Sequence, residues 1–277
     1  MTSTYGAIKL HQQSWATRRG IRFDSDGYTL SLDDNLFVPL SAEARGDFGS
    51  GAGAELGEAG KRGKMQALHS SAALAYNVFE YWRARDVEAI AQACGCSGQA
   101  TGMRFEAQHP TGLKGTPPHL DVEFICSSPA CGGGGVGVCI ESKFTEPYQD
   151  SPVKSMQAAY YTTPGLWAGM PRCEEVAQSL RNGDRRSRFD SPQLLKHILG
   201  LKGSYGLGGF RLLYLWYDFP STEAEEHRRD LAEFVRSIEG EVQFSHLTYQ
   251  ELFERIRELP QADAQYLAWL QERYFAG

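Results

Sequence analysis

Two stretches in the middle of the chain alternate between apolar and ionisable residues, and no other feature constrains the fold as strongly. They cover residues 119–126 and 137–146. A period of two is typical of β-strands with one buried face. Side chains two residues apart in a strand point the same way, so a hairpin of these strands gathers the charges on one face. The ionisable residues concerned are Asp121, Glu123, Glu141 and Lys143. We expect antiparallel pairing, with Asp121 opposite Lys143 and Glu123 opposite Glu141.

Carboxylates on central strands cost free energy unless something binds them. Oxygen ligands without imidazole or thiolate suit Mg²⁺ or Mn²⁺, and these ions act on phosphate substrates. We therefore expect Asp121 and Glu141 to hold such an ion. Lys143 stands beside them and is placed to orient the attacking water or to help deprotonate it.

The spacing of Asp121 and Glu141-Ser142-Lys143 resembles the signature of the PD-(D/E)XK nuclease superfamily, although Leu120 stands where the usual proline precedes the aspartate. Further similarity to a bacterial, restriction-endonuclease-like branch lies in residues 68–74, 77–79 and 141–147. The resemblance covers roughly residues 50–255. It implies an α/β fold with a restriction-endonuclease-like core, in which helices flank a central mixed β-sheet.

The resemblance also implies a metal-dependent DNA endonuclease with a restriction or defence role. Asp121 and Glu141 would be metal ligands, and Lys143 and Gln193 would complete the catalytic set. An upstream glutamate often completes such a metal site, and the sequence leaves three candidates open. These are Glu55, in a motif similar to that branch, Glu80 and Glu106.

Two other classes of protein remain open. A carboxylate-pair hydrolase such as a glycosidase needs an acid and a base, but no metal and no neighbouring lysine. A catalytically inactive member of the same fold would serve as a nucleic-acid-binding or interaction module. The intact set of Asp121, Glu141 and Lys143 favours an active enzyme over the inactive module.

The 277-residue chain has a net charge of −6, so its overall charge does not favour binding to the phosphates of DNA. Phosphate contacts must then come from local basic patches. We expect these contacts from the basic segment of residues 181–188 and from the helix that follows it; a solvated surface loop is the alternative. The candidates are Arg181, Arg185, Arg186, Arg188 and Lys196.

The order of elements along the chain predicts one large domain, residues 65–277, preceded by an N-terminal extension and Gly-rich segment, residues 1–64. Residues 1–40 read as peripheral strands or loops, and residues 41–64 as a mobile segment or active-site loop. A helix from Ser70 or Ser71 to about Ala84 comes next, and a strand at residues 104–108 follows it. After the hairpin we expect a helix at residues 191–200 that ends at Gly200, a buried strand at residues 210–219, and a helix–strand–helix unit to about residue 259.

Neither a secretory leader nor a membrane span is evident, so the sequence predicts a cytoplasmic protein. A homodimer remains open. The six cysteines suggest reduced thiols or a metal site rather than a disulfide framework. Five of them, Cys139 included, converge near the expected hairpin tip, and four are candidates for a structural Zn²⁺ site, although their spacing is not that of a zinc ribbon. They are Cys94, Cys96, Cys126 and Cys131.

Overall fold

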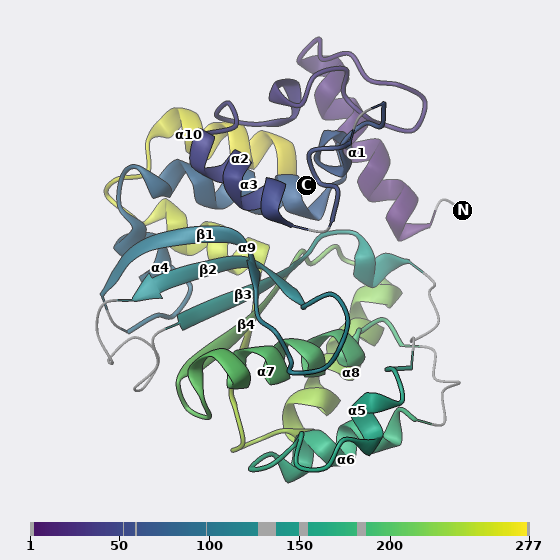
Figure 1. Cartoon of the computed structure of the whole chain (residues 1–277). Helices are drawn as coiled ribbons and strands as arrows, with labels where there is room; N and C mark the ends of the chain where they lie inside the picture. The colour runs from purple at the N-terminus through teal and green to yellow at the C-terminus, as the bar shows by residue number, and fades with distance from the viewer. Residues whose placement is uncertain are drawn as a thin grey trace.

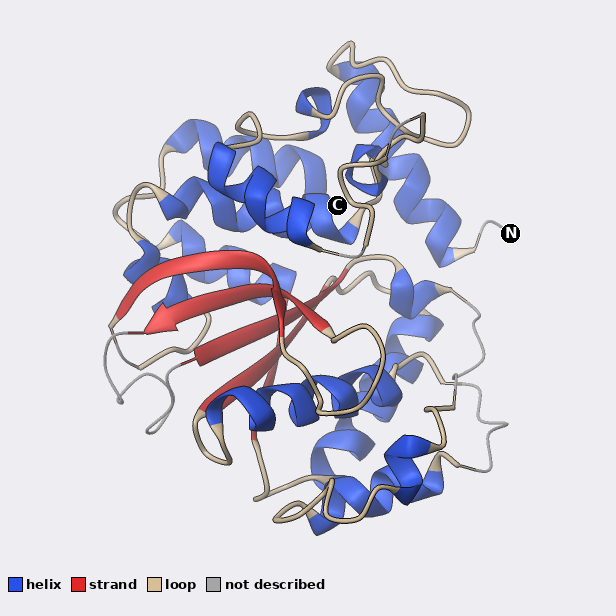
Figure 2. Ribbon diagram, in the orientation of Figure 1, coloured by secondary structure: helices blue, strands red, loops and turns tan. Residues whose placement is uncertain are grey.

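A five-stranded mixed β-sheet lies at the centre of the protein, with helices on both faces (Figures 1 and 2). The computed structural model describes residues 3–51, 53–58, 60–97, 99–126, 137–149, 155–181 and 187–275. The strands are β1 (Ala100–Gln108), β2 (His119–Cys126), β3 (Gly137–Lys143), β4 (Phe210–Trp216) and β5 (Gln243–Thr248). The longer helices are α1 (Thr4–Arg18), α2 (Ala42–Ser50), α3 (Ser71–Arg83), α6 (Pro171–Ser179), α7 (Ser191–Tyr205), α8 (Thr222–Ser237) and α9 (Tyr249–Arg257). Short helices are α4 (Val87–Ala93), α5 (Ala159–Thr162) and α10 (Ala264–Leu270).

The strands follow one another across the sheet in the order β1-β2-β3-β4-β5. β2 pairs antiparallel with both β1 and β3, whereas β4 pairs parallel with both β3 and β5. The parallel connections require crossovers, which α7 and α8 occupy. This confirms the predicted α/β fold with a central mixed sheet flanked by helices.

The two faces of the sheet differ as the alternation of residues predicts. Phe124 of β2 packs against Phe79 of α3, with ring centroids 6.1 Å apart. On the opposite face, His227 of α8 lies against Tyr214 and Trp216 of β4. Asp121 and Glu141 share this second face, which α7 covers (Figure 1).

The register of the β2–β3 pair differs from our prediction by two residues. Glu123 lies opposite Cys139, and Val122 lies opposite Ile140. A two-residue slip leaves every side chain on its original face, so the alternation that predicts the face cannot select this register. The slip decides the local charge pattern, because Asp121 comes beside Glu141 rather than opposite Lys143.

The N-terminal segment is more helical than predicted. Residues 4–18 form α1 where we expected strands or loops, and residues 42–50 of the Gly-rich segment form α2. Ser41 caps α2 by accepting the Ala44 N–H at 3.0 Å, and the helix buries Ala44 and Phe48 against the core. Burial of one short apolar stripe therefore outweighs the low helix propensity of the two glycines in α2.

The first and last helical segments of the described chain are joined by a buried arginine. Arg273 donates to the Asn35 carbonyl at 2.7 Å and to Gln12 Oε1 at 3.2 Å. Its guanidinium also lies over the Trp15 ring, 4.3 Å from the centroid. These neutral partners hold the charge inside the protein and join residues 12–35 to the C-terminal segment.

Helix α7 continues for one and a half turns beyond Gly200, where we had predicted its end. Asp190 rather than Ser191 caps it, by accepting the Gln193 N–H at 3.0 Å, and its last residue is Tyr205. Gly200 serves a different purpose, because a Cβ at this position would overlap the His109 carbonyl oxygen. The glycine thus permits close approach of α7 to the loop that joins β1 and β2.

We predict that Gly200→Ala lowers the free energy of unfolding by about 1–3 kcal/mol. The added methyl group would clash with the backbone carbonyl of His109, which cannot move away easily. The matched control is Gly46→Ala in α2, where nothing lies within 4 Å of the added Cβ. Helix propensity alone should make that variant about 0.5–1 kcal/mol more stable. Urea denaturation measures both values; an increase in stability for Gly200→Ala would contradict the close approach.

Candidate active site

A cleft of about 410 Å³ opens where β1, β2 and β3 meet the first half of α7. Its walls carry carboxylates, basic side chains, hydroxyls and the proline-rich loop before β2. The lining residues are Gly53, Ser71, Glu106, Thr116, Pro117, Pro118, His119, Asp121, Glu141, Ser142, Lys143, Gln193, Lys196 and His197. The four predicted catalytic residues, Asp121, Glu141, Lys143 and Gln193, are all among them.

Asp121 and Glu141 are brought together by the β2–β3 pairing. Asp121 accepts the backbone N–H of Ser142, with an N···O distance of 2.6 Å. This bond holds the aspartate against the strand that carries Glu141. Glu141 itself is only 1% exposed, so its charge depends on the groups around it.

Lys143 and His197 are the basic neighbours of Glu141. Lys143 Nζ lies 2.5 Å from Glu141 Oε1 and donates to Gln193 Oε1 at 2.9 Å. His197 Nε2 lies 3.0 Å from Glu141 Oε2, although this atom pair lacks the geometry of a hydrogen bond. Gln193 and His197 stand one turn apart on α7, so one helix face supplies both contacts.

The charges in the cleft are unevenly compensated. Burial raises the pKa of Glu141, but Lys143 and His197 outweigh it and hold this pKa at about 2. Burial together with the charges of Glu141 and Glu106 raises the pKa of Asp121 well above its usual value. Burial opposes the protonated form of Lys143, but Glu141 and other nearby acids raise its pKa above the ordinary value. A protonated Lys143 thus compensates the charge of Glu141, whereas Asp121 and Glu106 are buried near further carboxylates.

Glu106 is the third carboxylate of the cleft and was one of three candidates for that place. Burial, then the charges of Glu55 and Glu141, raises its pKa to about 7. His119 Nδ1 lies 3.2 Å from its Oε2. The backbone of Glu106 has a φ of 52°, a left-handed conformation that is strained for a residue with a side chain. Such strain concentrates at functional sites, where the surrounding structure enforces it.

The other two candidate glutamates are engaged elsewhere. Glu80 pairs with Arg83 within α3, at 2.9 Å. Glu55 pairs with Lys64 at 3.7 Å. It does not line the cleft, although its charge contributes to the raised pKa of Glu106. Glu123 lies on the same sheet face as Asp121 but pairs with Arg104 at 2.5 Å, so it does not contribute to the cleft.

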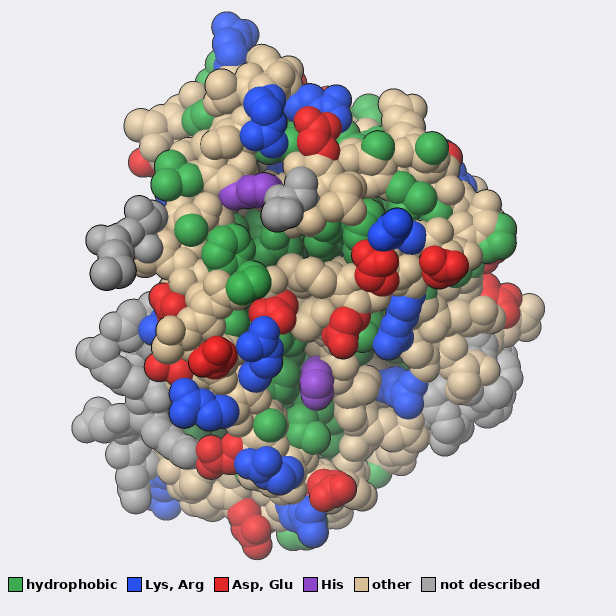
Figure 3. All heavy atoms as spheres, turned by 180° about the vertical axis from the view of Figure 1, so that it is seen from behind, with side chains coloured by type: hydrophobic (Ala, Val, Ile, Leu, Met, Phe, Trp, Pro, Cys, Tyr) green, Lys and Arg blue, Asp and Glu red, His purple; other side chains and the backbone are tan. Residues whose placement is uncertain are grey.

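Of the predicted phosphate contacts, Lys196 lines the cleft. Arg181 is exposed and lies near the Tyr161 ring, and Arg188 pairs with Glu226 at 3.2 Å. Arg185 and Arg186 lie outside the described residues. On the face shown in Figure 3, Lys and Arg side chains lie among Asp and Glu side chains rather than gathering by sign. Lys196 is therefore the predicted phosphate contact best placed for a substrate in the cleft.

The predicted zinc ligands are only partly visible. Cys94 is a buried free thiol, whereas Cys96 and Cys126 are disulfide-bonded and would need reduction before they could bind a metal. Cys131 lies outside the described residues. The four-cysteine site therefore stays a prediction.

Comparison with protein families matches residues 9–275 to the family described as restriction endonuclease associating with ARP. The chain belongs to this family. A search of curated proteins and a search of solved structures each returned no match. Membership gives the chain a nuclease-like or defence-related context, and the five-stranded α/β sheet agrees with a restriction-endonuclease-like core.

Within the described residues, no helix is long and apolar enough to cross a membrane.

Two histidines of this restriction-endonuclease-like cleft were not assigned to it from the sequence. In the sequence, Gln193, Lys196 and His197 fall on a common helix face at i, i+3 and i+4, but this spacing assigns His197 no role. His119 directly precedes the apolar alternation of β2, and its position two residues before Asp121 in the sequence was the available signal. Its contact with Glu106 depends on the β1–β2 pairing, which the sequence pattern does not measure.

We predict that the stability of the metal-free protein falls as pH rises from about 5 to about 8. The folded Glu106 retains its proton up to a pKa of about 7, from a reference of 4.5, whereas the unfolded chain releases it earlier. The folded state therefore loses an advantage of roughly 3 kcal/mol across this interval. Glu106→Gln should remove that part of the pH dependence.

Urea denaturation in EDTA at the two pH values measures the effect, with the exposed Glu239→Gln as control. The same loss of stability in Glu106→Gln as in the wild-type protein would show that Glu106 is not the responsible group.

Proposed function

We propose that the protein is a Mg²⁺- or Mn²⁺-dependent nuclease of the PD-(D/E)XK type that hydrolyses DNA phosphodiester bonds in restriction or defence. The observation that carries this proposal is the meeting of Asp121, Glu141 and Lys143 in one cleft, with Gln193 bound to the lysine. The family match supports the general class of activity.

The donor set of the cleft fits a hard divalent cation. Glu106, Asp121 and Glu141 supply carboxylate oxygens, and Glu141 Oε2 is buried without a hydrogen-bond partner among the described residues. Bound Mg²⁺ or Mn²⁺ supplies Lewis-acid stabilisation of the phosphate oxygens and a lower pKa for water. Added positive charge would also relieve the repulsion that raises the pKa of Asp121.

Lys143 acts in this proposal as a donor rather than as a general base. Its contact with Glu141 raises the pKa of Lys143, which favours the protonated form that donates. Gln193 accepts one of its N–H bonds and fixes the direction of the ammonium group. Lys143 is then placed to orient the attacking water and to stabilise charge on the phosphate.

We predict that plasmid and linear DNA are cleaved only with Mg²⁺ or Mn²⁺, and that Asp121→Asn, Glu141→Gln and Lys143→Met each reduce the rate by at least about 100-fold. The expected loss for Gln193→Ala is smaller, because it orients the lysine without supplying charge. Single-turnover cleavage assays measure the rates, and circular dichroism verifies that each variant is folded.

The exposed Glu239→Gln serves as a matched control that should retain full activity. Full activity in EDTA would exclude the proposed nuclease and favour a metal-independent carboxylate-pair hydrolase. Binding of DNA without cleavage at any divalent cation concentration would instead indicate an inactive binding module.

We also predict that Lys196→Gln weakens DNA binding and lowers the slope of log affinity against log salt by about one unit, as expected when one phosphate contact is lost. The control is Arg236→Gln, which removes an exposed charge on α8. Fluorescence anisotropy with a catalytically inactive background, Asp121→Asn, separates binding from cleavage. An unchanged slope would mean that Lys196 does not contact the DNA backbone.

A further inference from the structure

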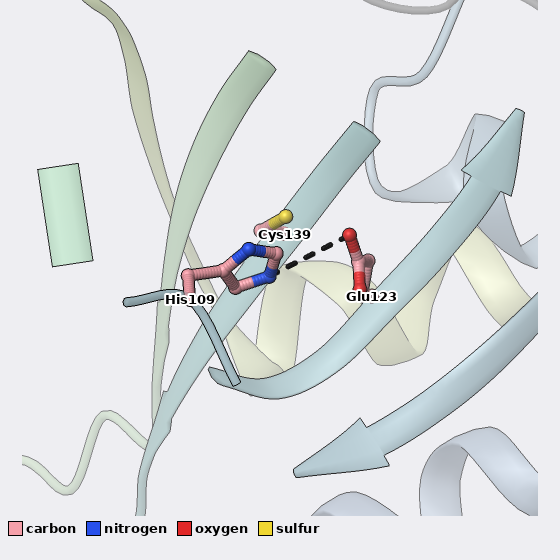
Figure 4. A group of neighbouring side chains, drawn as sticks. All are labelled: His109, Glu123 and Cys139. Atoms are coloured by element: carbon pink, nitrogen blue, oxygen red, sulfur yellow. Dashed lines mark ion pairs between the residues drawn. The ribbon is translucent and has the colours of Figure 1, made fainter. Parts of the chain in front are cut away.

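A second group of potential metal ligands lies beside the catalytic cleft and is separate from it. His109, Glu123 and Cys139 are each at most 2% exposed. One ligand atom from each, an imidazole nitrogen, a carboxylate oxygen and a thiol sulfur, lies within 4.8 Å of the other two. Figure 4 shows the three side chains pointing toward one another from the loop after β1, from β2 and from β3.

His109 has one ring nitrogen that is buried without a hydrogen-bond partner. Its Nδ1 lies 2.9 Å from the Ser204 hydroxyl, which fixes the orientation of the ring. Its Nε2 consequently faces the other two side chains, 3.6 Å from Glu123 Oε1, and makes no hydrogen bond. A buried polar atom without a hydrogen-bond partner costs roughly 1–3 kcal/mol, so a ligand for it would stabilise the protein.

Glu123 divides its two oxygens between different neighbours. Arg104 Nε binds Oε2 at 2.5 Å, while Oε1 accepts the Tyr205 hydroxyl and faces His109. Oε1 therefore remains directed into the group and has a further lone pair. Cys139 lies directly opposite Glu123 in the β2–β3 register and is a free thiol.

We propose that His109, Glu123 and Cys139 form a structural Zn²⁺ site. Nitrogen, oxygen and sulfur together are the donors of zinc, whereas Mg²⁺ and Mn²⁺ select oxygen alone. Tetrahedral zinc places its ligand atoms about 3.5 Å apart, so the three side chains would move closer together on binding, and a water molecule would take the fourth position. Binding replaces the Cys139 S–H bond by a sulfur–zinc bond and releases one proton. The Ser204 hydroxyl fixes the His109 ring as partners outside zinc spheres ordinarily do.

The position of this site explains what the ion would do. Glu123 stands two residues after Asp121 on β2, and Cys139 stands two residues before Glu141 on β3. Zinc would join the two strands next to the catalytic carboxylates and attach the β1–β2 loop to them through His109. It would stabilise the register that places Asp121 beside Glu141, without contacting the substrate.

The test is metal analysis and cobalt substitution of the full chain, purified without chelators under reducing conditions. We expect about one zinc per chain and, after exchange with Co²⁺, the near-ultraviolet absorption of a thiolate–cobalt bond. Cys139→Ala and His109→Gln should each lose this absorption, and Ser204→Ala should weaken metal affinity roughly 10- to 100-fold. Zinc removal should lower the melting temperature of the wild-type protein but not of Cys139→Ala.

The control variants separate this site from the other two metal sites under consideration. Glu141→Gln should keep the thiolate–cobalt absorption, because the carboxylate cleft contains no sulfur ligand. Cys94→Ala and Cys131→Ala should also keep it. Absorption that survives in both Cys139→Ala and His109→Gln, but disappears in the other cysteine variants, would overturn the proposal in favour of the four-cysteine site. Failure of the reduced wild-type protein to bind zinc at all would overturn it too.

If Cys139→Ala does not fold, His109→Gln decides the question, because glutamine can keep the contact with Ser204 while removing the Nε2 ligand. None of these measurements uses DNA cleavage. The zinc proposal therefore stands or falls independently of the proposed nuclease activity.

Discussion

The ion pair between Glu141 and Lys143 is the interaction on which the candidate active site depends. Glu141 is almost completely buried, and an unpaired charge there would be strongly unfavourable. Lys143 supplies the opposite charge and is itself held by Gln193 of α7. The pair therefore links the central strand β3 to the helix that covers it. Gly200 sets how closely that helix approaches the β1–β2 loop, so packing remote from the cleft controls the position of its polar groups.

Three carboxylates and two lysines line the cleft, with Lys143 paired to Glu141. The pKa values of Asp121 and Glu106 are raised, since both groups are buried near further carboxylates. The strained backbone of Glu106 adds to this cost, because it holds a third acid at a place a relaxed strand would not. A bound cation, as the proposed function requires, would relieve this repulsion.

Much of the architecture followed from local patterns that survive in the tertiary structure. The alternation in residues 119–126 and 137–146 placed β2 and β3 correctly, and α9 begins with a capping box of Thr248 and Glu251, a pattern that is local in the sequence. Patterns failed where long-range packing outweighed local preference. α1 has little apolar periodicity, yet it is held by contacts of Gln12 and Trp15 with Arg273, more than two hundred residues away. Gly200 suggested a helix end because glycine is favoured both at helix C-termini and where two backbone segments approach closely. The sequence does not distinguish the two.

For the site itself, the sequence alone determined which residues share a face of the sheet and one face of α7. Asp121, Glu141, Lys143, Gln193 and Lys196 were predicted in this way and meet in one cleft. Only the tertiary structure decided the strand register, which of the three upstream glutamates lines the cleft, and the pairing of Glu123 with Arg104 and His109. The reason is that periodicity reports the direction of a side chain within its own element. Which charges become neighbours depends on how elements pack, and that is decided by shape and burial summed over the whole core.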